Sequence, residues 1–238
     1  MIKHHKEIDP SPGREIVDRF FSGTGATYDR IAGLCTFGFD RRWKEKILKR
    51  IPPRPRLILD QACGTGILTF MIARRFPGCR VIGVELREEY LHIARQKAKA
   101  LHIENVAFIL SRAEDVLLDE RVDCITSSYL AKYAEMNPLV RNAKKMLRRH
   151  GVLLMHDFIY PSRPWFARIW EFYFLLLRNA GARRYPQWKR VFYELPGFLR
   201  QSRWVDELLT GLKEMGFERI EAQTLTLGTS TIVAAAKP

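Results

Sequence analysis

The sequence predicts an α/β fold in which a mostly parallel sheet is covered by helices on both faces. A short apolar run at residues 57–59 is typical of a buried parallel strand. Glycines within residues 64–66 indicate a tight turn, and residues 67–76 have the apolar spacing of a helix. Strand and helix patterns then alternate as far as residue 158, as in sheets built from right-handed crossovers.

A helical cap is expected in front of the sheet, at residues 14–53. Residues 1–13 carry prolines and a glycine and are expected to be a flexible N-terminus. A helix at residues 40–50 places Trp43 and Ile47 inward and its basic residues outward.

The elements that follow the first β-α unit are predicted in the same way. Asn137 is expected to cap the helix between the fourth and fifth strands, with Pro138 at the first helical position. Further strands are expected at residues 80–85, 105–110, 122–127 and 151–158.

The C-terminal part adds an insertion, a helix and a hairpin. Residues 160–201 form an aromatic, arginine-rich helical insertion, and Ser202 is expected to cap a last helix that Gly216 ends. Two strands within residues 217–236 have the pattern of an antiparallel hairpin. This order of elements, in a single domain at residues 14–238, fits the Rossmann-like sheet of class I methyltransferases better than that of a dehydrogenase.

Two acids beside the glycine turn predict the cofactor. The turn brings the backbone close to a ligand, and the helix behind it presents unpaired N–H groups. Asp60, at the end of the first strand, would repel a pyrophosphate and attract the ammonium end of S-adenosylmethionine. Glu85 follows Gly66 by 19 residues, about the spacing at which an acid on the second strand meets ribose hydroxyls. The pattern therefore predicts S-adenosylmethionine rather than a dinucleotide.

Composition narrows the remaining classes. The chain has 238 residues and a formal net charge of +14. Such a charge favours binding to nucleic acid, anionic lipid or an acidic substrate, and it is also consistent with solvated helix faces that keep the protein soluble. No apolar run approaches the roughly 20 residues of a membrane span, and no secretion signal opens the chain, so a cytoplasmic location is expected. The four cysteines lack C-x-x-C spacing, and neither a metal site nor a disulfide framework is expected.

Short motifs along the chain point to a family. They are Tyr28-Asp29 with Phe37-Gly38 and Trp43-Lys44, the glycine motif at residues 59–66, Ala113-Glu114, residues 123–126, and the ending Leu225-Thr226-x-Gly228. From about residue 24 to residue 238 the chain resembles the ubiquinone/menaquinone biosynthesis C-methyltransferase family. The resemblance implies that Tyr28 reaches the methionine end of the cofactor and Ser128 forms a wall of its pocket. It further implies that Thr65 and Gly64 form the backbone site, that Glu85 meets the ribose and that Ala113 lies at the adenine edge. From the residue patterns and the resemblance together, the expected cofactor site comprises Tyr28, Asp60, Ala62, Gly64, Thr65, Gly66, Glu85, Leu86, Arg112, Ala113, Glu114 and Ser128.

The chain departs from the family pattern mainly on the acceptor side. Ala32 replaces an asparagine, and Arg112 replaces the Asn or Asp that precedes the alanine of the third-strand motif. Lys132-Tyr133 replaces an Arg-Asn pair that the family is credited with using to activate the quinol ring. The resemblance therefore implies methyl transfer without securing the quinone as acceptor.

Candidate catalytic residues lie near the ends of the fourth and fifth strands, where open α/β sheets bind ligands. An acceptor carbon or hydroxyl gains reactivity by losing a proton, and His156 or Asp157 is the candidate base. Tyr129 and Tyr133 are candidates for the pocket lining, and for each of these residues the alternative is sheet-end packing or exposure to solvent. Lys132 is also a candidate anchor for an acidic group on the substrate. The candidates are Tyr129, Lys132, Tyr133, His156 and Asp157.

The insertion and the motifs together leave three functional hypotheses. Residues 164–177 are too short and too charged to span a bilayer, and are expected either to form a lid over an apolar acceptor or to pack on the core.

The first hypothesis is a methyltransferase acting at carbon on a hydrophobic aromatic acceptor such as a prenylated quinol or demethylmenaquinol-like lipid, with an anionic membrane surface as a further candidate partner. The second is N- or O-methylation of a phospholipid headgroup or small metabolite, and the third is a non-catalytic binding protein. Nucleic acid is disfavoured because Ser127-Ser128-Tyr129-Leu130 is not the Asn/Asp-Pro-Pro-Tyr of base-amine methyltransferases; the oligomeric state stays open.

Overall fold

The fold is built on a seven-stranded sheet, seen in a computed structural model that describes residues 12–238. Its strand order is β3-β2-β1-β4-β5-β7-β6, with all neighbours parallel except the two pairs that involve β7. The mostly parallel sheet with a C-terminal antiparallel hairpin is confirmed. The strands are β1 (Leu57–Gln61), β2 (Arg80–Glu85), β3 (Val106–Leu110), β4 (Val122–Ser128), β5 (Leu147–Phe158), β6 (Glu218–Leu225) and β7 (Ser230–Ala236).

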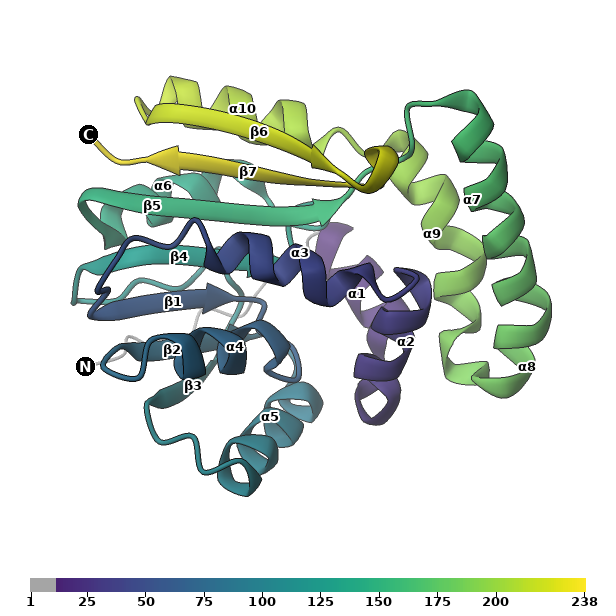
Figure 1. The fold of residues 1–238 in the computed structure, drawn as a ribbon, viewed down its shortest axis with the longest axis horizontal. Helices are drawn as coiled ribbons and strands as arrows, with labels where there is room; N and C mark the ends of the chain where they lie inside the picture. The colour runs from purple at the N-terminus through teal and green to yellow at the C-terminus, as the bar shows by residue number, and fades with distance from the viewer. Residues whose placement is uncertain (1–11) are drawn as a thin grey trace.

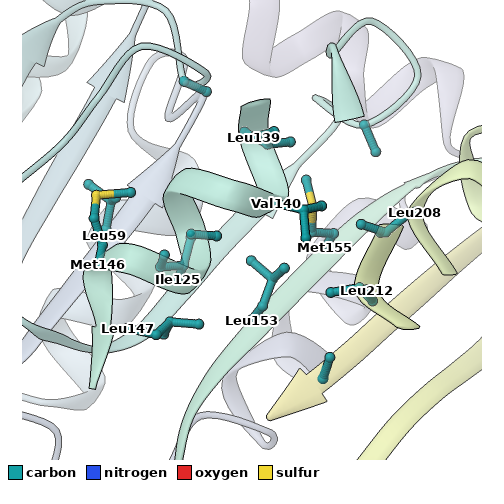
Figure 2. Close-up of a cluster of buried hydrophobic side chains, with 14 of the residues drawn as sticks. Leu59, Ile125, Leu139, Val140, Met146, Leu147, Leu153, Met155, Leu208 and Leu212 are labelled. Carbon is teal, nitrogen blue, oxygen red and sulfur yellow. The ribbon is translucent and has the colours of Figure 1, made fainter. Parts of the chain in front are cut away.

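Helices cover both faces of this sheet (Figure 1). Side chains of α3 and α4 pack with one face of the sheet, and α5 packs beside α4 at the β2–β3 end. Helices α6 and α10 cover the other face, where Figure 2 shows Leu208 and Leu212 of α10 beside Met155, in one cluster with Leu139 and Val140 of α6. The helices are α1 (Pro12–Phe21), α2 (Tyr28–Cys35), α3 (Phe39–Leu48), α4 (Ile67–Arg75), α5 (Glu88–Ala100), α6 (Met136–Met146), α7 (Pro164–Leu176), α8 (Ala182–Arg184), α9 (Lys189–Gln201) and α10 (Trp204–Glu214).

Strand β1 lies at the centre of the sheet, and its burial explains why a short apolar run forms a parallel strand. All five of its residues are buried, since helices lie on both faces. The strand continues past the apolar run because its two polar residues have partners. The amide of Gln61 donates to the carbonyl oxygen of Ala113 at 3.2 Å, and both carboxylate oxygens of Asp60 accept from hydroxyls.

Several predicted boundaries are wrong by one to four residues, and the largest difference is at β5, which begins at Leu147 rather than at residue 151. Of the N-terminus predicted to be flexible, residues 1–11 lie outside the described residues, while Pro12 and Gly13 belong to α1, where a proline in the first turn gives up no helical hydrogen bond. Helix α6 begins at Met136, so that Pro138 sits inside its first turn and Asn137 is not the cap. Helix α10 is preceded by Arg203 rather than Ser202 at the cap position.

One predicted orientation is also wrong. Lys44, expected on the outward face of α3, is only 3% exposed, and its ammonium group binds the carboxylate of Asp40 one turn earlier. A helical wheel places a charged residue outward, and it carries no information about a partner buried beside it.

A second layer of helices stands at one end of the sheet. The insertion forms α7, α8 and α9 together with short turns, and its side chains pack with those of α1 and α2 in one cluster that includes Phe20, Ile31, Trp188 and Phe192. Figure 1 shows α9 between α7 and the pair α1–α2, which leaves α7 on the outside of the molecule. Among the described residues, no helix combines the length and the apolar character that crossing a membrane requires.

Candidate functional site

Two adjoining cavities lie where the helical layer meets the carboxyl ends of the strands. The outer cleft encloses about 780 Å³ of empty space, its open mouth included, between α1, the glycine turn and the ends of β2, β3 and β4. The inner cavity holds about 430 Å³ of empty space, its open mouth included, between the end of β5, α2 and α9. Phe21, Tyr28, Tyr129 and Tyr133 line both cavities, so the two spaces share one wall.

The outer cleft gathers nine of the twelve residues predicted to hold the cofactor. Three of the twelve, Asp60, Thr65 and Gly66, are not part of its lining. The nine are Tyr28, Ala62, Gly64, Glu85, Leu86, Arg112, Ala113, Glu114 and Ser128.

Glu85 is fixed at the floor of the outer cleft by the backbone on either side. Its Oε2 accepts from the N–H of Gly64 at 2.9 Å, and its Oε1 accepts from the N–H of Arg87 at 3.0 Å. Burial raises the pKa of the Glu85 carboxyl, and the backbone donors oppose that rise. The side chain thus joins the glycine turn to the tip of β2 and presents a rigid acceptor to the cleft.

The two glycines of the turn have different structural roles. Both adopt left-handed backbone angles, with φ of 58° at Gly64 and 89° at Gly66. A Cβ on Gly66 would lie 2.4 Å from the ring of Phe70, whereas one on Gly64 would meet nothing nearer than 3.8 Å. Gly66 is therefore required for the entry into α4, and Gly64 is the glycine that faces the cleft.

Asp60 and Thr65 are engaged by other side chains. The carboxylate of Asp60 accepts from Thr69 at 2.6 Å and from Thr126 at 2.7 Å, and it lines a smaller space beside Tyr28 and Lys44. Burial raises the pKa of Asp60 to about 6. The hydroxyl of Thr65 donates to Asp29 of α2 at 2.5 Å, so Thr65 ties the turn to the helical cap.

Charged groups in the outer cleft are balanced within the protein. Arg112 forms an ion pair with Glu135 at 2.8 Å and lies 3.7 Å from Glu114. Arg87 pairs with Asp18 of α1 at 2.6 Å, while its buried Nε has no hydrogen-bond partner in the described structure. These arginines are therefore not free to neutralise a pyrophosphate.

Sequence reasoning missed several residues that line the outer cleft, among them Phe21, Tyr90 and Ser111. The ring of Tyr90 lies edge-on to that of Tyr28 with centroids 5.2 Å apart, and its hydroxyl is 2.6 Å from that of Thr24. Tyr90 lies on α5 and follows Glu85 by only five residues, so the sequence contains a short-range signal for its place beside the cleft. The contribution of α1 had no sequence signal, because it depends on a tertiary contact.

The inner cavity is apolar and aromatic with one cation on its wall. Side chains from Ile31 and Ala32 of α2 and Val191 and Leu195 of α9 form its sides. The Nζ of Lys132 lies 4.3 Å from the centre of the Tyr133 ring, which itself stacks on Phe198. Of the predicted catalytic residues, Tyr129, Lys132 and Tyr133 line this cavity.

Lys132 forms a buried ion pair with Asp157. Their Nζ and Oδ1 atoms are 2.5 Å apart, and Asp157 also accepts from the backbone N–H groups of Lys132 and Phe158. Burial lowers the pKa of Lys132 and raises that of Asp157, and their mutual attraction opposes both changes. Asp157 is fully buried and holds Lys132, while Lys132 alone of the pair reaches the cavity.

Tyr129 stands on the shared wall in a conformation that side chains seldom adopt. Its φ is 74°, its hydroxyl donates to Asp40 at 2.6 Å, and its ring stacks on Phe158 with centroids 4.7 Å apart. Asp40 is the residue that binds Lys44, so a small charged network backs the ring. A non-glycine residue held at positive φ is a costly feature that contacts on every side must maintain.

His156 occupies a different position from the other catalytic candidates. It is fully buried, its two ring nitrogens lie 3.0 Å from the hydroxyl of Ser128 and 2.9 Å from that of Ser230, and neither described cavity includes it. Burial and the nearby Lys44 and Lys132 charges lower its pKa well below the usual value. The neutral imidazole therefore links β4 to β7 across β5 and supports Ser128 from behind.

The outer cleft suits a cationic nucleoside better than a dinucleotide. Four tyrosine rings line it, and ring faces attract cations. Glu85 and Glu114 add negative charge, and Arg87 and Arg112 are already paired. Within residues 12–238 no group of three or more His, Cys, Asp or Glu is placed to hold a metal ion. The residues present thus fit a sulfonium nucleoside.

Comparisons with known proteins agree with this geometry. The sequence profile of the ubiE/COQ5 methyltransferase family matches residues 10–237. A demethylmenaquinone methyltransferase of Porphyromonas gingivalis is 26% identical over 93% of this chain and 92% of its own length. One from Thermus thermophilus is 30% identical over 69% of this chain and 80% of its own length.

A solved structure shows the same fold at lower sequence identity. The plantazolicin methyltransferase BpumL, in complex with S-adenosylhomocysteine, has a TM-score of 0.65 at 14% identity and covers 95% of each chain. At that identity the likeness is evidence for the architecture alone.

Proposed function

This chain belongs to the ubiE/COQ5 methyltransferase family and is an S-adenosylmethionine-dependent methyltransferase, and we propose that it methylates a ring carbon of a hydroxylated aromatic lipid. The acceptor that fits best is a demethylmenaquinol-like quinol, as in the names of the relatives. The observation that carries the proposal is the aromatic inner cavity, which opens beside the outer cleft and carries Lys132 on its wall.

In this proposal the outer cleft holds the cofactor. Glu85 is the acceptor for the ribose hydroxyls, because its position at the tip of β2 is fixed by two backbone hydrogen bonds. Gly64 allows close approach of the backbone, and Ala113 with Ser111 forms the edge next to the base. The rings of Tyr28 and Tyr133 lie on the wall shared with the inner cavity, where a positive sulfur is favoured.

The inner cavity then holds the acceptor ring. Its apolar sides favour an aromatic lipid over a polar metabolite, because most of the lining atoms belong to aromatic and aliphatic side chains. The tyrosine rings and Phe158 orient a flat ring by stacking.

Lys132 is proposed to activate the acceptor. Its ammonium group donates a hydrogen bond to a ring hydroxyl oxygen and stabilises the phenolate form of that oxygen. The proton of that hydroxyl passes to solvent, and electron density rises on the neighbouring ring carbon. This carbon attacks the methyl carbon as the bond from methyl to sulfur breaks, and its own proton is then lost to solvent as the ring becomes aromatic again. Asp157 acts as a positioning residue, because it fixes Nζ of Lys132 and keeps the amine charged despite burial.

The chain's other residues contribute alignment rather than proton transfer. S-adenosylmethionine, when bound, supplies an electrophilic methyl carbon on a sulfur that leaves readily. Displacement of this kind depends on alignment of the attacking and leaving atoms, and alignment alone can supply roughly 7–11 kcal/mol of the barrier. The strained Tyr129 and the network of Asp40 and Lys44 hold the shared wall in one position.

The protein is further proposed to work in the cytoplasm at the surface of a membrane, because the acceptor it fits is a lipid. This location is supported by the positive net charge of +14, which favours anionic surfaces. Methylation at nitrogen or oxygen is the second candidate, and the replacement of the family's Arg-Asn pair by Lys132-Tyr133 is the observation that favours it.

The attacked atom is identified by the product. Purified protein is incubated with ¹³C-methyl S-adenosylmethionine and a reduced demethylmenaquinone carrying a short side chain, and the extracted quinone is examined by mass spectrometry and carbon NMR. We expect one labelled methyl group on a ring carbon, which survives alkali. Label on oxygen, or label that enters only phospholipid headgroups when total lipid is supplied, would exclude carbon methylation, and absence of transfer to every acceptor would favour a non-catalytic protein.

A further inference from the structure

Helix α7 is apolar on two opposite faces, and packing explains only one of them. Ala167, Trp170 and Phe174 are buried against α9 in the helical layer. On the other face Trp165, Ile169, Phe172 and Leu176 follow one another at spacings of four, three and four residues and are 48–59% exposed. A helix that is apolar all round is expected inside a protein or against lipid, and α7 lies on the outside (Figure 1).

The exposed face of α7 continues onto the helical cap. The ring of Phe37, 53% exposed in the turn between α2 and α3, lies with its centroid 3.8 Å from that of Tyr173. Leu34 is also exposed, and its carbonyl oxygen accepts from the hydroxyl of Tyr173 at 2.7 Å. We call this surface the outer stripe; its residues are Leu34, Phe37, Trp165, Ile169, Phe172 and Leu176.

The segment that contains α7 is strongly basic. Residues 160–201 contain eight arginines and lysines against two glutamates. The guanidinium of Arg178 and the ammonium of Lys189 lie 5.2 Å and 5.8 Å from the ring centre of the half-exposed Tyr193. A tyrosine flanked by cations is typical of a membrane interface, where the ring meets the acyl region and the charges meet phosphate.

The length of α7 sets how it would meet a bilayer. Its 13 residues extend about 20 Å at 1.5 Å per residue, less than the hydrocarbon thickness of about 30 Å. Such a helix lies in the plane of the interface with its apolar face among the acyl chains.

We infer that the outer stripe docks on an anionic lipid bilayer and that α7 lies in its surface. The inference deepens the proposed function, on which it rests for the identity of the acceptor. The inward face of α7 belongs to the same side-chain cluster as Trp188, Val191 and Leu195, which line the inner cavity. Docking through the outer stripe therefore places the acceptor cavity one helical layer away from the lipid in which a quinol would be dissolved.

Vesicle flotation tests this docking without cofactor or acceptor. We expect the protein to float with vesicles of phosphatidylglycerol and phosphatidylcholine and to remain unbound to phosphatidylcholine alone. The double variant Trp165→Ser/Phe172→Ser is expected to bind anionic vesicles at least tenfold more weakly. A matched double variant, Leu101→Ser/Leu117→Ser, removes two leucines of 44% and 55% exposure outside the outer stripe and is expected to bind like the original protein.

Three results would overturn the inference: binding unchanged by the Trp165→Ser/Phe172→Ser double variant, equal binding to neutral vesicles, or a dimer in solution that this variant splits while no vesicles are bound. Methyl transfer to a water-soluble hydroxylated ring is measured on the same samples, where the double variant is expected to retain the original rate. Lost docking with retained transfer supports the inference, and docking without transfer to any acceptor contradicts the proposed function instead.

Discussion

The Nζ of Lys132 lies 2.5 Å from Oδ1 of Asp157. Their side chains are 1% and 0% exposed, so this is the most deeply buried ion pair beside the two cavities. Such a pair is costly to bury, since both ions lose their hydration. Hydrogen bonds from the backbone of Lys132 and Phe158 offset part of that cost for Asp157. The Nζ of Lys132 also donates to the carbonyl oxygen of Tyr129 at 3.4 Å and lies against the ring of Tyr133, and Lys132 lines the inner cavity.

Substitutions in this ion pair should separate its effect on the stability of the protein from its effect on methyl transfer. We expect Lys132→Met to lower the free energy of unfolding by about 3–5 kcal/mol, because the carboxylate of Asp157 is left buried without its partner. The double variant Lys132→Met/Asp157→Asn removes both charges and should regain much of that stability. Methyl transfer should stay at least 100-fold reduced in both, measured at a temperature where both are folded. Recovery of activity together with stability would show that the pair is only structural.

Removal of the charge of Glu85 should weaken cofactor binding. Glu85→Gln keeps the size of the side chain but replaces one of the two carboxylate oxygens, each of which accepts a backbone N–H in the original protein. Loss of one charged hydrogen bond to the ribose predicts a Kd for S-adenosylmethionine roughly 10-fold to 100-fold higher by calorimetry. Glu88→Gln, an exposed acid three residues further on, is the matched control. An unchanged Kd in Glu85→Gln would exclude the proposed ribose site.

The pH dependence of stability should carry a contribution from Asp60. Burial raises its pKa from the usual 3.8 to about 6, so between these values the folded protein holds a proton that the unfolded chain has released. The stability from this proton is fully present below pH 3.8 and is lost as the pH rises through 6, by up to about 3 kcal/mol. Denaturant titrations from acid to neutral pH should show this decline, and Asp60→Asn should lack it. Parallel curves for the two proteins would mean that Asp60 does not titrate in this range.

A side chain at Gly66 should disturb the turn. Gly66→Ala places a Cβ 2.4 Å from a ring atom of Phe70 at a φ of 89°, so either the ring or the turn must move. We expect a loss of at least 1–2 kcal/mol in unfolding free energy, roughly the cost of a left-handed alanine before any clash. Gly78→Ala, where a Cβ meets nothing within 4 Å, should be nearly neutral. Equal melting curves for the two variants would contradict this assignment.

A larger residue at Ala32 should block the acceptor and spare the cofactor. Ala32 lines the inner cavity but not the outer cleft, so Ala32→Phe fills space intended for the aromatic ring. We expect kcat/KM for the quinol to fall at least tenfold, while the Kd for S-adenosylmethionine changes less than twofold. Ala100→Phe, at the exposed end of α5, controls for the added ring. Normal quinol turnover by Ala32→Phe would place the acceptor elsewhere.

The parts of the fold that the sequence predicts depend on local patterns. The apolar run of β1, the glycines after it and Glu85 lie within 30 residues, and the structure brings Glu85 onto the backbone of Gly64. Long-range partners escape this reasoning. Asp60 was expected at the cleft because it ends a strand, yet Thr69 and Thr126 bind its oxygens, one of them 66 residues away.

Buried charge is the other feature that local patterns misjudge. Lys44 and Lys132 look like surface residues in sequence, and each is buried on a carboxylate. Asp40 precedes Lys44 by one helical turn, so that pair had a local signal, whereas Asp157 is 25 residues from Lys132 and meets it only through the pairing of β4 with β5. The wall formed by α1 likewise arises from packing between segments far apart in the chain.

The central claim is that the outer cleft holds the sulfonium nucleoside and the inner cavity holds the acceptor ring. A crystal structure with S-adenosylhomocysteine and a short-chain demethylmenaquinol tests it most directly. We expect the ribose at Glu85, the quinol ring in the inner cavity against Tyr129, and a ring oxygen within hydrogen-bonding distance of Nζ of Lys132. Nucleoside bound away from Glu85, or a quinol outside the inner cavity with Lys132 facing no ligand, would contradict it.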